Sequence, residues 1–348
     1  MKKYLSEILL IQILATYLVV FGHSYPFTID IPIWLDRTRL FLYSFHMPLF
    51  VWISGYLLIY TQQTERYGMA GFAKKRFSKL LIPYFALSII AILPKYAFQP
   101  FLNDAVSLDC YSLLRMFFVP RENVWGHFWF LPMIFILGVL GYFLDKLFER
   151  YKIKNYGWGI SACVFFAGYV LTTTVCSASW WWGGVTRWLS ISDIIQFGWL
   201  YALGAFSACN NWLQKIDTPK YSVLATLSIV LAILLFLCKM PVMLTPVKTA
   251  VIATAMIFSL SKLCIYISKS VEINRNAVYA QTFTIFLLSW PCQAVANVIT
   301  ERVLHWPYFA IMPIQFCVGI ICPMILIWLI AKIEKRYNFH WISFILGN

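Results

Sequence analysis

Apolar residues run along the chain in long stretches separated by short polar and basic segments, a pattern typical of membrane-spanning helices. A helix needs about 20 mostly apolar residues to cross a bilayer. Ten segments of that size are present: 8–27, 40–60, 80–98, 127–147, 156–175, 191–209, 222–240, 246–267, 278–299 and 309–331. We therefore expect an all-α polytopic membrane protein, a bundle of about ten transmembrane helices, organised as a single domain over residues 1–348.

Composition agrees with this pattern. The chain is 61% hydrophobic and only 12% charged, whereas a soluble domain carries about 25% charged residues. The formal net charge of +14 favours basic helix ends over a nucleic-acid partner, because lysine and arginine gather on the cytoplasmic side of membrane proteins. The nine cysteines are scattered without a C-x-x-C pair, so they predict neither a metal site nor a disulfide framework.

The distribution of basic residues predicts the orientation in the membrane. With the N-terminus in the cytoplasm, 19 of the 28 lysines and arginines fall on the inner side and 9 on the outer side. This bias predicts an even number of spans, with both termini cytoplasmic, in the cell (inner) membrane. Lys2 and Lys3 precede an apolar run without a signal-peptidase motif, so we expect the first segment to be retained.

Three histidines, His23, His46 and His127, lie at the outer ends of apolar segments under this topology. An imidazole inside an apolar segment must be paired or functional. A single one is most often a satisfied residue at the interface, whereas three at one depth are what an acid/base site needs. The residues alone leave both interpretations open.

Tryptophans also gather on the outer side, and the run Trp180-Trp181-Trp182 precedes two glycines. An interfacial aromatic belt explains any one of them, but three in succession favour a flat platform on which a sugar ring stacks. We predict a substrate-binding role for four outer residues: His127, Trp129, Trp181 and Arg187.

A basic cluster on the inner side precedes the third apolar segment and consists of Lys74, Lys75, Arg76 and Lys79. Lys75 and Lys79 are spaced i, i+4, which places them on one face of a helix. The cluster either anchors the helix at the membrane surface or binds the phosphates of a cofactor.

Four motifs together resemble one known family, the acyltransferase-3 membrane O-acyltransferases of the fucose 4-O-acetylase-like kind. They are Val19-Val20-Phe21-Gly22-His23-Ser24; Ser44-Phe45-His46-Met47-Pro48-Leu49-Phe50 with Ser54-Gly55-Tyr56-Leu57; the basic Lys74–Tyr84 stretch; and His127-Phe128-Trp129-Phe130-Leu131-Pro132. The motif-bearing part covers residues 8–135.

The resemblance implies transfer of an acyl group, typically acetyl from acetyl-CoA, to a hydroxyl of a cell-surface or lipid-linked glycan. It implies catalytic roles for His23 and His46 and a CoA-binding role for the basic cluster. Many members carry Arg or Lys eleven residues before the first histidine, about 16 Å along a helix. Here that position is Gln12, which we expect to support the acyl donor by hydrogen bonding.

We expect His23 to be the general base for the acceptor hydroxyl and His46 to orient the acceptor or stabilise the oxyanion, without a metal. A covalent acyl-enzyme on a histidine or on Ser24 is an open alternative. The rival from another class is a transporter or flippase for a lipid-linked saccharide. The sequence does not determine the oligomeric state, and membrane lipid is the other partner we expect.

Overall fold

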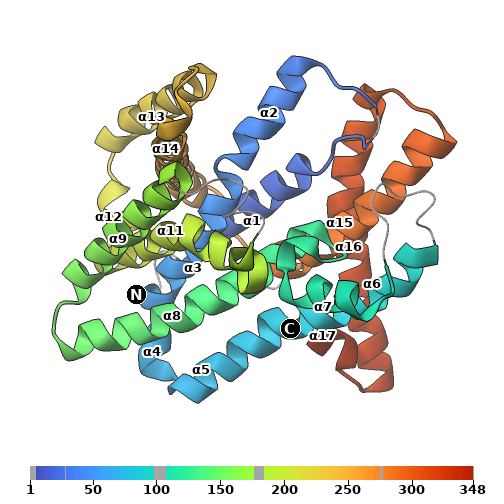
Figure 1. Ribbon diagram of the computed structural model, residues 1–348, viewed down its shortest axis with the longest axis horizontal. Coiled ribbons are helices and arrows are strands. Elements are labelled where there is room, and N and C mark those ends of the chain that lie inside the picture. The colour runs from blue at the N-terminus through green and yellow to red at the C-terminus, as the bar shows by residue number, and fades with distance from the viewer. Residues whose placement is uncertain (1–4, 28, 98–106, 176–183, 275–276, 348) are drawn as a thin grey trace. The chain divides into compact units, whose positions relative to one another are not determined.

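Helices make up all the regular structure that is described (Figure 1). The structure is a computed structural model, and it describes residues 5–27, 29–97, 107–175, 184–274 and 277–347. This confirms the all-α fold class predicted from the apolar pattern.

Nine helices in the described ranges are long and apolar enough to cross a membrane: Ile33–Tyr60, Met69–Ala97, Gly126–Arg150, Lys154–Thr174, Val185–Cys209, Lys220–Leu237, Val242–Ser268, Thr282–Val303 and Tyr308–Tyr337. The shorter apolar helix Ser6–Gly22 precedes them. These ten helices coincide with the ten predicted segments, so the chain is a multi-pass membrane protein. The cytoplasmic location of both termini stays a prediction.

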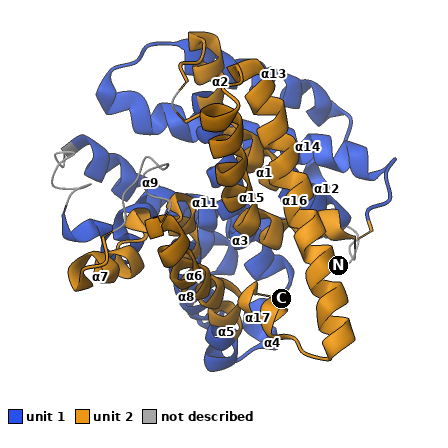
Figure 2. Ribbon diagram, turned by 90° about the vertical axis from the view of Figure 1, so that its right-hand side faces the viewer, with its two compact units in different colours: residues 1–15, 40–74, 133–273 blue, residues 16–39, 75–132, 274–348 orange. Residues whose placement is uncertain are grey.

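Contacts group the chain into two compact units (Figure 2). Residues 1–15, 40–74 and 133–273 form unit 1, and residues 16–39, 75–132 and 274–348 form unit 2. The helices α1 (Leu5–Gly22), α2 (Ile33–Tyr43), α5 (Met69–Arg76) and α8 (Phe130–Arg150) each include a unit boundary.

Unit 1 is a helical bundle in which α11 packs against both α3 and α9, and α13 packs against α14. Its complete helices are α3 (His46–Tyr60), α4 (Gln63–Arg66), α9 (Lys154–Val175), η5 (Val185–Ser190), α11 (Ile191–Cys209), α12 (Trp212–Ile216), α13 (Lys220–Leu237), η6 (Val242–Leu244) and α14 (Thr245–Ser268). Only 11% of the most apolar window of α13 is buried in the protein, which fits a helix that faces lipid.

Glycines bring the backbones of α3 and α11 into direct contact. A Cβ atom at Gly55 would lie 1.9 Å from the carbonyl oxygen of Tyr201, and one at Gly204 would lie 2.0 Å from that of Trp52. Small residues at such crossings let membrane helices approach closely and gain packing energy. Gly55 therefore holds its place in the second motif because no side chain fits there.

One buried carboxylate of unit 1 is paired with three polar side chains. Asp145 of α8 is fully buried and accepts hydrogen bonds from the Thr64 hydroxyl (2.6 Å) and the Trp158 indole (3.2 Å). The ammonium of Lys154 lies 3.2 Å from the same carboxylate. A buried charge is tolerated when it is paired and hydrogen-bonded in this way.

Unit 2 contains the segments that carry His23 and His127. Its complete helices are η1 (Phe77–Leu81), α6 (Ile82–Ala97), α7 (Cys110–Phe118), η3 (Pro120–Glu122), η4 (Gly126–Trp129), η7 (Val278–Ala280), α15 (Thr282–Asn297), η8 (Val298–Val303), α16 (Tyr308–Tyr337) and α17 (Trp341–Ile345). α15 packs along α16, and the apolar side chains of Val20, Ile285 and Ile327 form one of its cores.

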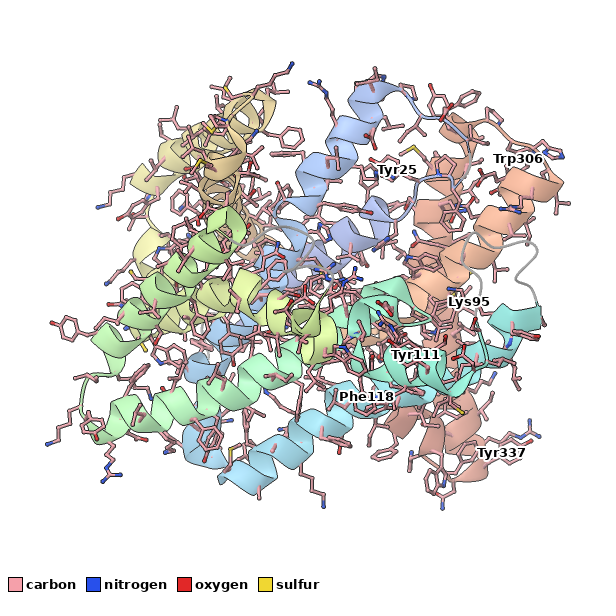
Figure 3. The ribbon with its side chains drawn as sticks, in the orientation of Figure 1. Tyr25, Lys95, Tyr111, Phe118, Trp306 and Tyr337 are labelled. Carbon is pink, nitrogen blue, oxygen red and sulfur yellow. The ribbon has the colours of Figure 1, made fainter. Side chains whose placement is uncertain are left out.

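Polar contacts fix the segment that leads to His127. Arg115 forms two hydrogen bonds with Glu122, and its guanidinium also donates to the Tyr111 hydroxyl at 2.9 Å. Lys95 of α6 donates to the carbonyl of Val124 at 2.8 Å; Tyr111 and Lys95 are labelled in Figure 3. The arrangement restrains the chain directly before η4.

We predict that Gly55→Ala destabilises the protein by about 1–3 kcal/mol or more, because the added methyl group overpacks a backbone contact. The measurement is the thermal unfolding midpoint in detergent. The matched control is Gly168→Ala on α9, where a Cβ atom would meet no heavy atom within 4 Å. Equal midpoints for the two variants would contradict the close contact of α3 with α11.

Candidate active site

The first helix ends directly before His23. α1 stops at Gly22, and the backbone N–H of His23 lies 3.1 Å from the carbonyl of Val19 and 3.3 Å from that of Val20. The last carbonyls of a helix lack partners within the helix and must find them elsewhere. His23 therefore occupies a turn at the helix end, where its ring is half-buried.

The Val20 carbonyl is the main anchor of this turn. It accepts the Ser24 hydroxyl at 2.7 Å, and the side-chain nitrogen of Gln293, from α15, lies 2.9 Å away. The same nitrogen lies 3.0 Å from the Ser24 oxygen. Ser24 is fully buried and donates its proton to the backbone, so it holds the turn in place.

Two of the predicted histidines meet here. The ring centroids of His23 and His127 lie 6.3 Å apart, although 104 residues separate them in the sequence. Trp290 of α15 contacts both: its ring is 6.4 Å from that of His23 and 6.3 Å, nearly parallel, from that of His127. The structure thus brings the first and fourth motifs together around one tryptophan.

His127 is buried without a standard hydrogen bond. It lies on the 3-10 helix η4 and is 6% exposed, and neither ring nitrogen has a partner of normal geometry. Phe128 and Phe286 contact the ring at centroid distances of 4.7 and 5.3 Å. The backbone carbonyl of Leu287 interacts with this imidazole, but no hydrogen bond of standard geometry forms. A buried polar group in this state costs free energy, and a polar group of a ligand would complete its hydrogen bonding.

Trp129 lies two residues after His127 on η4. The guanidinium carbon of Arg121 lies 4.2 Å from the centre of its ring, a cation–π contact. The sugar-binding role that the sequence predicts for Trp129 remains a prediction.

His46 belongs to unit 1 and lies at the N-terminal end of α3. Its Nδ1 is 2.7 Å from the carbonyl of Leu42, and the side chain is 5% exposed. A carbonyl partner requires a proton on Nδ1, which leaves Nε2 as the acceptor. The predicted catalytic role of His46 is untested by this geometry.

The basic cluster is divided by a change of helix type. α5 ends at Arg76, and the π-helix η1 continues it and carries Lys79. The charges of Lys75 and Arg76 act on Lys79 across this change. Lys79 lies 5.7 Å from the ring of Phe283. Lys74 and Lys75 are exposed and Arg76 is half-buried, so these cations can reach a soluble phosphate group.

The remaining predicted residues lie elsewhere. Gln12 is half-buried in α1, and Arg187 is half-buried in η5 of unit 1. Trp181 lies outside the described residues. None of these positions tests the role predicted from the sequence.

Sequence reasoning missed the contribution of α15. Trp290, Gln293, Asn297 and Glu301 follow a spacing of three, four and four residues, which places them on one face of the helix. Polar side chains on one face of an apolar segment mark buried or functional positions. This spacing of polar residues can be read from the sequence of the predicted segment 278–299 and of the residues directly after it.

A family model described as an acyltransferase domain matches residues 5–332 of the chain. The match includes α15, η8 and most of α16 as well as the four motifs. Comparisons with curated proteins and with solved structures give no significant match.

We predict that His127→Leu leaves the free energy of unfolding unchanged or raises it by about 1 kcal/mol, because it removes an unpartnered buried polar group. His46→Leu is the matched comparison, and we expect it to lose about 1 kcal/mol with its hydrogen bond to Leu42. Both are measured by thermal unfolding in detergent. A strong loss of stability for His127→Leu would show that its ring has a structural partner.

Proposed function

The chain belongs to the acyltransferase-3 family of membrane acyltransferases, and from this we propose that it moves an acetyl group from acetyl-CoA to a hydroxyl of a glycan. The observation that supports the proposal best is the pair of His23 and His127, whose rings lie 6.3 Å apart beside Trp290. We propose the cell membrane as its location and a cell-surface or lipid-linked glycan as the acceptor.

In this proposal His23 is the general base. Its imidazole takes the proton of the acceptor hydroxyl while the hydroxyl oxygen attacks the thioester carbonyl carbon. The tetrahedral intermediate collapses, the carbon–sulfur bond breaks, and the CoA thiolate recovers the proton from the imidazolium. The products are an O-acetyl ester and free CoA.

His127 lines the acceptor side of the site. Its ring nitrogens have no hydrogen-bond partner of standard geometry, so a sugar hydroxyl can supply one without displacing a protein group. Trp129 and Arg187, with Trp181, are the other residues that we assign to the acceptor, and His46 orients it or stabilises the oxyanion.

Four cations, Lys74, Lys75, Arg76 and Lys79, bind the phosphates of CoA in this proposal. CoA is a cytoplasmic molecule, and clustered cations on a short helical stretch suit its phosphates. Gln12, between the two ends of α1, donates hydrogen bonds to the donor where many family members have a cation.

We predict that His23→Ala lowers transfer of labelled acetyl groups from acetyl-CoA to membrane glycan by about 100-fold or more, since general-base catalysis contributes that much. The control is His305→Asn, an exposed histidine with positive φ that Asn tolerates. Transfer that survives in His23→Ala would move the chemistry to His46 or Ser24. Native protein that moves glycan across the membrane without acetylating it would favour a transporter.

We predict that replacing Lys75, Arg76 and Lys79 by Gln raises the KM for acetyl-CoA by about tenfold or more, with kcat little changed, because each cation contributes about 0.5 kcal/mol to phosphate binding. The native KM should rise with salt for the same reason. Lys146→Gln, an exposed lysine paired with Glu149, is the control. An unchanged KM in the triple variant would show that the cluster only anchors the helix.

A further inference from the structure

The loop that follows α1 is held by one face of α15 and its π-helical extension η8. Gln293, Asn297 and Glu301 are spaced i, i+4, i+8, and each contacts the end of α1 or the loop. The Gln293 amide donates to the carbonyl of Val20 at 2.9 Å, and the Asn297 amide donates to the carbonyl of Tyr25 at 3.1 Å. Tyr25, labelled in Figure 3, is two residues beyond His23.

Glu301 makes the most specific of these contacts. Its two carboxylate oxygens accept the backbone N–H groups of Phe27 at 2.8 Å and of Ile29 at 2.9 Å. The side chain is only 5% exposed. A carboxylate can accept on both oxygens, whereas an amide in its place would present a donor to one of the two N–H groups.

A second buried side chain, Gln315 of α16, contacts the same stretch of α15. With its amide turned so that the nitrogen faces the carbonyl of Gln293 and the oxygen faces the N–H of Asn297, it donates at 2.8 Å and accepts at 2.7 Å. It therefore stands between two backbone groups that an uninterrupted α-helix would pair directly. Insertion of a side chain into the helical ladder deforms a helix, and the π-helix η8 begins at the next residue, Val298.

The space for this arrangement is provided by a glycine on α16. A Cβ atom at Gly319 would lie 2.6 Å from Val20 and 2.7 Å from the side-chain nitrogen of Gln293. Gly319 and Gln315 are one turn apart, so one face of α16 supports the polar face of α15.

The loop held by Glu301 also contributes an aromatic ring, that of Phe27, next to the tryptophan that contacts His23. Phe27 stacks on Trp290 at a centroid distance of 5.6 Å, and Trp290 in turn contacts His23. Trp125 lies against the same tryptophan at 6.1 Å. Release of the Phe27 amide from Glu301 would therefore free both the backbone after His23 and a ring that packs beside it.

We propose that Glu301 is a positioning residue that fixes the orientation of His23 through the backbone of Phe27 and Ile29. The inference rests on the proposed function of His23 as general base. Glu301 touches no reacting group in this arrangement; it acts by holding the backbone on which the imidazole is mounted. A misplacement of about 1 Å in a reacting group can cost about 100-fold in rate.

The test compares Glu301→Gln with native protein at equal amounts of folded protein in detergent or proteoliposomes. We expect kcat for acetyl transfer to fall by about 100-fold, with the KM for acetyl-CoA within about twofold of the native value. Glu149→Gln is the matched control, because it makes the same chemical change in a surface ion pair with Lys146, away from His23 and His127 in the sequence. We expect its kcat to stay within about twofold of native.

Hydrogen–deuterium exchange tests the loop independently of activity. Amides in residues 23–27 and 29–31 should exchange at least about tenfold faster in Glu301→Gln than in native protein or Glu149→Gln. Unchanged exchange, an unchanged kcat, or a loss of kcat with an equal rise in KM would each overturn the proposal. If native protein transfers no acetyl group, the proposed function fails, while exchange still decides whether Glu301 holds the loop.

A milder variant covers the case in which Glu301→Gln does not fold. Asn297→Ala removes only the hydrogen bond to the Tyr25 carbonyl. We expect about a tenfold lower kcat with an unchanged KM for acetyl-CoA, and faster exchange in the same loop. Native kcat and native exchange in this variant would overturn the role of this face of α15.

Discussion

Backbone groups at the end of α1 and in the residues that follow it pair with side chains of the protein, because a buried backbone polar group without a partner costs free energy. The Val20 carbonyl receives the Ser24 hydroxyl and the Gln293 amide, and the Tyr25 carbonyl receives Asn297. The N–H groups of Phe27 and Ile29 go to Glu301. The position of His23 is a consequence of these pairings, since its ring is attached to the backbone that they fix.

One helix connects this polar network with the two histidines. The face of α15 that carries Gln293 and Asn297 also carries Trp290, one turn earlier, which contacts both His23 and His127. Packing of α15 along α16 requires Gly319, so the geometry of the histidine pair depends on helix contacts far from the first motif in the sequence.

Individual buried polar groups differ in how well they are satisfied. Asp145 and His46 have protein partners at normal distances, as expected for groups that stabilise a fold. His127 has none of standard geometry. Such a group lowers stability, so a functional contact is expected to offset the loss. In our proposal this contact is with the acceptor.

The sequence by itself determined the class of the protein. Its apolar segments were long enough to cross a membrane only as helices, and the motifs around His23, His46 and His127 identified the family. Two of these histidines, His23 and His127, lie close together in the structure. These features are local, because helix length and motif order depend on neighbouring residues alone.

The tertiary structure decided which distant residues support His23. Glu301 lies 278 residues beyond His23, and in the sequence it resembles any other charged residue at a helix end. The contact of Glu301 with the Phe27 N–H group depends on the packing of α1, α15 and α16. The same packing brings the Gln315 side chain against α15, directly before the π-helix η8. Backbone hydrogen-bond partners across such a distance leave no pattern in one sequence, since the donating N–H group is the same in every residue but proline.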